Sequence, residues 1–147
     1  MPNFMRMFLG IVLGFLCFDL NAQEAENAVV DNDLGNVRYV INQQITAFQN
    51  EDSELAFSFA SPMIRAQFGS PQNFMRTVKQ HYNSIYSTKS FTFGGYVAQD
   101  GHVMQEIEFI SATDNSIHLA VYKLIKFKKY GWRITGVELV AKPEKAI

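Results

Sequence analysis

Apolar residues recur at every third or fourth position after residue 33, which is the spacing of one face of a helix. This spacing predicts a helix over residues 33–50. Its apolar stripe consists of Leu34, Val37, Ile41, Ile45 and Phe48. The polar residues Asn42, Gln43, Gln49 and Asn50 lie away from this stripe.

Capping residues predict the helices that follow. The run Glu51-Asp52-Ser53 interrupts the first pattern and is typical of the start of a second, short helix. Ser61-Pro62 and Ser70-Pro71 each combine a Ser that accepts from an unpaired backbone N–H with a Pro that fits the first helical position. We therefore expect helices over about 62–68 and 71–82.

The period changes from helical to alternating after Tyr86, which indicates strands. Asp100-Gly101 is a strong signal for a two-residue hairpin, and Gly94-Gly95 predicts a bulge within the first run. The connecting loops are short, so neighbouring strands are antiparallel. Four strands are predicted, over residues 90–98, 102–110, 117–127 and 132–140.

These elements predict one α+β domain over residues 33–141, with the helices on one face of a curved four-stranded antiparallel sheet. Alternation leaves one sheet face apolar, and that face must be covered. If the sheet curls around the first helix, it encloses a cleft of the kind in which small domains bind ligands.

The N-terminal segment has the features of a signal peptide. Arg6 precedes an uncharged apolar run, Met7–Phe18, and Ala22 is a small residue suited to the cleavage position. We expect residues 1–22 to be removed and the protein to be exported, to the periplasm or outside the cell. Twelve apolar residues are too few to span a membrane, so no transmembrane segment is predicted in the mature chain.

Cleavage would leave a short flexible lead, 23–32, a domain and a frayed tail, 142–147. The single cysteine, Cys17, lies in the predicted signal peptide, so the mature chain has no thiol chemistry and no disulfide. The three histidines lack the spacing of metal ligands, and neither a metal nor another cofactor is expected. They are His81, His102 and His118.

Charge excludes one class of partner. The chain carries 13 Lys and Arg against 14 Asp and Glu, and this near-neutral balance argues against nucleic-acid binding. One local basic stretch stands out around the last predicted turn. It is interpreted as a solvated turn, with contact to an anion or a membrane surface as the alternative. Its residues are Lys123, Lys126, Lys128 and Lys129.

One arrangement of residues favours an enzyme. Glu106 and Glu108 share a face of the second strand, and His118 and Tyr122 share a face of the third. If those faces coincide, a carboxylate base lies beside a tyrosine, as an isomerase or cyclase requires to remove a proton next to a carbonyl. We favour the alternative, in which both glutamates line the solvated outer face. The pairing register, which decides between them, does not follow from the sequence.

A non-catalytic binding domain is the leading hypothesis. Aromatic side chains with a polar tip are suited to line a cleft for a small apolar ligand or a partner peptide. The candidates are Tyr82, Tyr86, Tyr122 and Trp132. Gln44 and Gln105 are polar residues within apolar segments, and we expect them to bond to each other or to a ligand. A third hypothesis is a structural module that forms a homodimer through the exposed sheet face.

Four strings resemble the domain-of-unknown-function family numbered 4864. They are Ile41-x-x-Gln44-Ile45-x-Ala47-Phe48, Ala56-Phe57-Ser58-Phe59-Ala60-Ser61-Pro62, Phe68-Gly69-Ser70-Pro71-x-x-Phe74 and Gly131-Trp132-Arg133-Ile134-x-Gly136. The resemblance covers about residues 36–140 and implies an α+β cone similar to nuclear transport factor two, in an exported bacterial or organellar protein. It implies no known activity. The chain departs from the family at Asn83-Ser84-Ile85, where members often have prolines, and at Val137, where they often have Cys.

Overall fold

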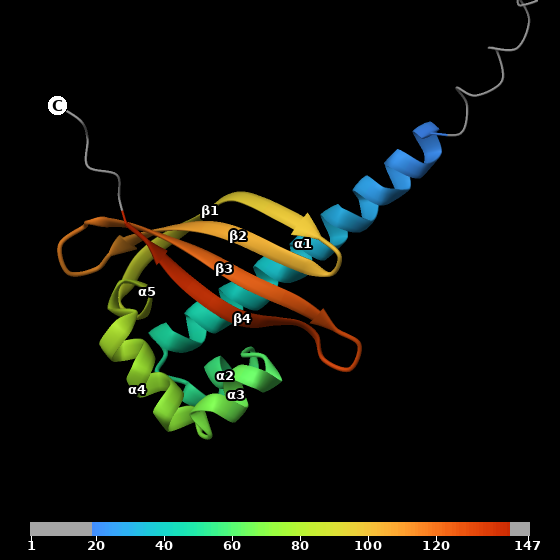
Figure 1. The fold of residues 1–147 in the computed structure, drawn as a ribbon. Coiled ribbons are helices and arrows are strands. Elements are labelled where there is room, and N and C mark those ends of the chain that lie inside the picture. Colours follow the sequence, from blue (N-terminus) through green and yellow to red (C-terminus); the bar gives the residue numbers. More distant parts are fainter. Residues whose placement is uncertain (1–18, 142–147) are drawn as a thin grey trace, which may run out of the picture. The chain divides into compact units, whose positions relative to one another are not determined.

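The computed structural model describes residues 19–141 (Figure 1). The predicted signal peptide, 1–22, lies almost entirely outside these residues, as does the predicted tail, 142–147. Contacts between residues divide the chain into two units after Asp33. The second unit, from Leu34 onward, contains the four strands and the hydrophobic core. Within the described part of the chain, no helix is long and apolar enough to span a membrane.

The first helix, α1, begins earlier than its apolar stripe indicates. It spans Asp19–Gln49, so residues 23–32, predicted as a flexible lead, are helical. This stretch is rich in Ala, Glu and Gln, which favour helix without any apolar period. The predicted stripe is confirmed from Val37 onward, and its fully buried members include Ile41 and Ile45.

Four short helices follow, and the predicted caps form. They are α2 (Ser53–Ser58), α3 (Pro62–Phe68), α4 (Pro71–His81) and α5 (Asn83–Tyr86). Asp52 accepts from the N–H of Leu55 at 3.0 Å, and Ser61 accepts from Ile64 at 3.3 Å. Ser70 caps α4 in the same way. The last helix, α5, was not expected as a separate element.

The strands form a four-stranded antiparallel sheet in the order β1-β2-β3-β4, as predicted. They are β1 (Thr88–Gln99), β2 (His102–Ser111), β3 (Ile117–Phe127) and β4 (Gly131–Val140). Asp100 and Gly101 both have positive φ, 50° and 74°, which is the conformation of a tight hairpin turn. The register of β1 against β2 breaks between Phe93 and Tyr96, so the predicted glycine bulge is confirmed.

The helices of this unit lie against one face of the sheet (Figure 1), which confirms the α+β class. Side chains on this inner face alternate with exposed ones along β2. The buried inner-face residues are Val103, Gln105, Ile107 and Phe109 of β2, Ala120, Tyr122 and Leu124 of β3, and Trp132 and Ile134 of β4. Among the described residues no helix covers the outer face, which exposes Met104, Glu106 and Glu108. This outer face is the one on which a homodimer is predicted.

Candidate functional site

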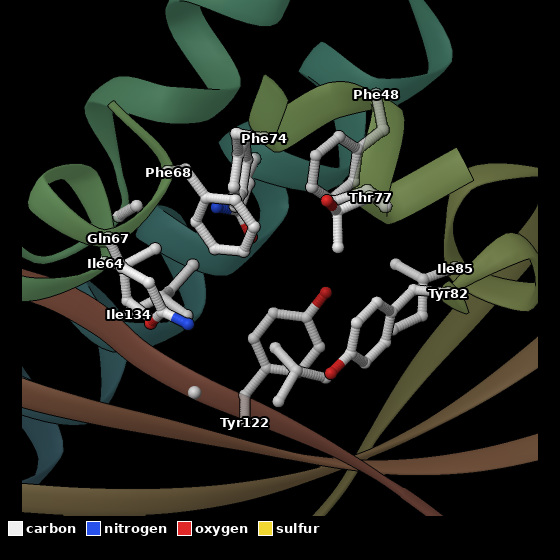
Figure 2. A pocket seen from close by; sticks show the side chains of 15 residues that line it. Phe48, Ile64, Gln67, Phe68, Phe74, Thr77, Tyr82, Ile85, Tyr122 and Ile134 are labelled. Carbon is white, nitrogen blue, oxygen red and sulfur yellow. The ribbon is translucent and has the colours of Figure 1, made fainter. Parts of the chain in front are cut away.

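A pocket of about 240 Å³ lies between the helices and the inner face of β3 and β4 (Figure 2). Most of its lining is apolar, and much of that is aromatic. The apolar lining residues are Phe48, Ala60, Ile64, Phe68, Phe74, Val78, Ile85, Ile134 and Val137. A concave, mostly apolar space with a few polar groups is the usual form of a small-molecule site.

The apolar face of α4 forms one wall of the pocket. Phe74, Val78 and Tyr82, which stand four residues apart, all line it. The ring of Phe74 is the centre of an aromatic cluster, with centroids 5.5 Å from both Phe57 and Phe68. Because helices α2, α3 and α4 are short, this cluster holds them together and fixes the wall.

Tyr122 contributes the pocket's most unusual polar group. Its side chain is fully buried, and its hydroxyl points from β3 into the space enclosed by the helical side chains (Figure 2). The hydroxyl has no hydrogen-bond partner among the described residues. Burial raises the pKa of Tyr122 far above its usual value, so the group stays protonated and can donate. An unsatisfied buried hydroxyl costs about 1–3 kcal/mol.

The other polar side chains of the pocket carry no charge, and two of them bond to the backbone. Gln44 Nε2 donates to the carbonyl of Ala56 at 3.1 Å, and Thr77 Oγ1 donates to Asn73 at 3.1 Å. Of the residues that the structure describes, no Asp, Glu, Lys, Arg or His lines the pocket. No group of potential metal ligands occurs in the described part of the chain. The pocket therefore suits an uncharged ligand.

The four aromatic residues predicted to line a cleft separate into two pairs. Tyr82 and Tyr122 line the pocket. Tyr86 does not, because its hydroxyl donates to Glu51 Oε1 at 2.5 Å on the surface. Trp132 is buried in the core on β4, outside the pocket lining. Phe74 also lines the pocket but is absent from the predicted cleft residues; its helical spacing with Val78 and Tyr82 is the signal that would have found it.

The register of the sheet separates the predicted catalytic residues. Tyr122 pairs with Gln105, which places both on the inner face. Glu106 and Glu108 are exposed on the outer face, so the sheet lies between their carboxylates and the Tyr122 hydroxyl. The base–tyrosine pair required by the enzyme hypothesis is therefore not formed, and the solvated-glutamate alternative describes the structure. His118 is exposed and contacts a serine in the turn before β3.

The two buried glutamines also differ from expectation. Gln44 and Gln105 do not bond to each other. Gln44 bonds to α2 through Ala56, whereas Gln105 accepts from Arg38 Nε at 3.1 Å and donates to backbone carbonyls of the sheet. Each glutamine satisfies a different part of the fold, and only Gln44 lines the pocket.

The model of the family described as domain of unknown function (DUF4864) matches residues 30–147. The chain belongs to this family. The match confirms the resemblance carried by the Ser-Pro strings and extends it to both ends of the domain. No curated protein and no solved structure was found to match the chain. The family description states no activity, so the function of this DUF4864 domain has to be inferred from its geometry.

A second polar cluster of the DUF4864 domain lies in the exposed turn between β2 and β3. Ser116 Oγ donates to Asp114 Oδ1 at 2.7 Å and lies 2.7 Å from His118 Nε2. In a catalytic triad the histidine stands between the other two groups, but here the serine does. The Ser116 hydroxyl and N–H stabilise the carboxylate and lower the pKa of Asp114 to about 2. The cluster therefore stabilises a turn.

This turn gives a pH prediction. Ser116→Ala should raise the pKa of Asp114 from about 2 toward its ordinary value of 3.8. An NMR titration that follows the carboxyl carbon of Asp114 measures this change. Because the folded pKa is the lower one, the stabilisation is present above about pH 4 and is lost as the pH falls toward 2. Ser58→Ala, in α2, is the control and should leave the titration unchanged. An unchanged Asp114 pKa in Ser116→Ala would contradict the assignment.

Proposed function

We propose that this domain binds a small, uncharged and mostly apolar ligand that carries one hydrogen-bond acceptor. The observation that carries the proposal is the Tyr122 hydroxyl, which is buried, protonated and directed into an apolar pocket without a partner among the described residues. A ligand with an acceptor at this point would recover the hydrogen bond that the protein itself leaves unmade.

The pocket volume limits the size of the ligand. An engineered apolar cavity of about 150 Å³ in another protein accepts benzene, and the present pocket measures about 240 Å³. Pockets for drug-sized ligands begin at about 300 Å³. The ligand class that fits is therefore an aromatic or alicyclic ring with a short substituent, and a carbonyl on that substituent would supply the acceptor.

A matched pair of probes tests the role of the hydroxyl. Acetophenone and α-methylstyrene have the same shape, but only acetophenone has a carbonyl oxygen. We expect both to bind, with NMR shifts that map to the pocket lining. The hydrogen bond should favour acetophenone by about 1.4 kcal/mol, which is about tenfold in the ratio of the two dissociation constants.

Tyr122→Phe is the decisive variant. It removes the hydroxyl and keeps the ring, so the preference for acetophenone should fall about tenfold while α-methylstyrene binds as before. Without ligand, this variant should be as stable as the native protein or up to about 3 kcal/mol more stable, because it removes an unsatisfied buried group. An acetophenone preference that persists in Tyr122→Phe would overturn the role of the hydroxyl.

A second pair of variants tests the pocket itself. Val137 pairs with Tyr122 across β3 and β4 and lines the pocket, so Val137→Phe should fill it and abolish binding of both probes. Val97→Phe places the same larger side chain at an exposed position of β1 and should leave binding unchanged. If neither probe binds the native protein, or if Val137→Phe binds them equally well, the proposal fails.

A further inference from the structure

Two arginines from distant parts of the sequence lie near the edge strand β4, where a helix is bridged to it. The N–H of Ser61 donates to the carbonyl of Ile134 at 2.8 Å, and the N–H of Ile134 donates to Phe59 at 2.9 Å. This bridge fixes the start of α3 to β4. Arg65 lies one turn into α3, and Arg133 immediately precedes Ile134, so the bridge places both residues near the same edge.

Neither guanidinium group has an acidic partner among the described residues. Arg133 folds back on its own strand, where Nη1 donates to the carbonyl of Trp132 at 2.7 Å. The Nε atoms of Arg65 and Arg133 are both buried, and neither finds an acceptor in the part of the chain that is described. Burial and the nearby charge of Arg65 lower the pKa of Arg133. Two neighbouring like charges, each with a buried Nε donor that lacks an acceptor, are an arrangement that an anion would stabilise.

A tyrosine ring and a lysine lie beside Arg65. The guanidinium of Arg65 lies 5.6 Å from the centre of the Tyr130 ring, and Lys129 Nζ lies 5.2 Å from the same ring. We name this group of three cations the basic edge: Arg65, Lys129 and Arg133. It adds Arg65 and Arg133 to a lysine of the basic turn seen in the sequence, and none of the three lines the pocket.

We propose that the basic edge binds a phosphate group through Arg65 and Arg133. A carboxylate has two oxygens and satisfies one guanidinium fork, whereas a tetrahedral phosphate offers oxygens to two forks at once. Lys129 adds to the positive potential around the site without fixing its geometry. This site is separate from the proposed ligand pocket and stands whether or not that pocket is occupied. The phosphate belongs either to a free small molecule or to a lipid headgroup.

The first test uses inorganic phosphate with the full domain. In nitrogen–proton NMR spectra, the Nε–H signals of Arg65 and Arg133 should shift saturably with phosphate and not with chloride at equal ionic strength. Arg133→Met and Arg65→Met should each weaken phosphate binding at least about tenfold, because one fork is lost. Arg76→Met is the matched control, since Arg76 is an exposed arginine on α4 that bonds to Asn73. That variant should bind phosphate normally.

The second test distinguishes the source of the phosphate. The protein is sedimented with phosphatidylcholine vesicles that do or do not contain phosphatidic acid. Binding only to the vesicles with phosphatidic acid identifies a lipid headgroup, if Arg133→Met and Arg65→Met both reduce that binding. Binding of inorganic phosphate without vesicle binding identifies a free small molecule. Native spectra of each variant show that it is folded. The proposal is overturned if phosphate acts no more strongly than chloride and vesicle binding is absent or is unchanged in both variants.

Discussion

Phe74→Ala is expected to lower the free energy of unfolding by about 3–5 kcal/mol, the cost of truncating a buried phenylalanine. The Phe74 ring is buried and contacts Phe48, Phe57 and Phe68, with centroid separations of 5.5–6.1 Å. These contacts join α4 to α1, α2 and α3, so the truncation weakens several helix contacts at once. Urea unfolding followed by circular dichroism measures the change.

Two controls separate the size of the side chain from its position. Phe74→Leu keeps most of the volume and should cost less than about 1.5 kcal/mol. Met63→Ala truncates a side chain on α3 that is 66% exposed, so its effect should stay within about 0.5 kcal/mol. If Phe74→Ala were no more destabilising than Met63→Ala, the aromatic cluster would not hold the helices together in solution.

Helices α2, α3 and α4 and the hairpin turn at Asp100-Gly101 could be predicted because short-range chemistry decides them. Ser61 and Ser70 each cap the helix that follows by accepting a backbone N–H three residues away. Asp100-Gly101 adopts the two positive φ angles that its residue types favour. In each case the residues that carry the signal also form the structure, and no distant contact is needed.

The sheet register could not be predicted, because both faces of β3 are apolar. Leu119 and Val121 alternate with Ala120 and Tyr122, so periodicity does not distinguish the covered face from the open one. The helical layer makes the choice by burying Ala120 and Tyr122. A shift of one residue exchanges the faces, and it decides whether Tyr122 meets Glu106 or a pocket. The enzyme hypothesis depended on this choice.

The lining of the pocket was only partly predictable for a related reason. Tyr82 and Tyr86 lie four residues apart and have the same chemistry, yet only Tyr82 lines the pocket. Tyr86 is held at the surface by Glu51, which is 35 residues away in the sequence, and Lys79 lies over its ring. The residue type indicates that a tyrosine can line a pocket, but contacts with residues distant in the sequence decide which tyrosine does so.

The side chain of Gln105 connects α1, β1 and β2 through one buried amide. Its Nε2 lies 3.1 Å from both the Gly94 and Gly95 carbonyls of the bulge and 2.8 Å from the Glu106 carbonyl. Its Oε1 accepts from Arg38 Nε on α1 at 3.1 Å. The glutamine is fully buried, so these backbone groups and the arginine depend on it for their hydrogen bonds.

Gln105→Leu is therefore expected to lower the free energy of unfolding by about 2–4 kcal/mol, although leucine is more apolar. The variant loses the hydrogen bond from the charged Arg38, and the carbonyls of Gly94 and Gly95 lose the donor that the amide provides. Gln99→Leu, at an exposed position of β1, is the matched control and should change stability by less than about 0.5 kcal/mol. Equal stabilities of the two variants, measured by urea unfolding, would show that the buried amide contributes nothing.

Gln105→Glu distinguishes the two ends of the amide. A carboxylate keeps the acceptor for Arg38 but places an oxygen against the Gly94 and Gly95 carbonyls, where a donor is required. We expect it to destabilise at neutral pH at least as much as Gln105→Leu. The carbonyls and burial raise the pKa of this carboxyl in the folded state, so stability should increase again as the pH falls and the group regains a proton to donate. Native stability of Gln105→Glu at neutral pH would instead mean that the contact with Arg38 alone holds α1 to the sheet.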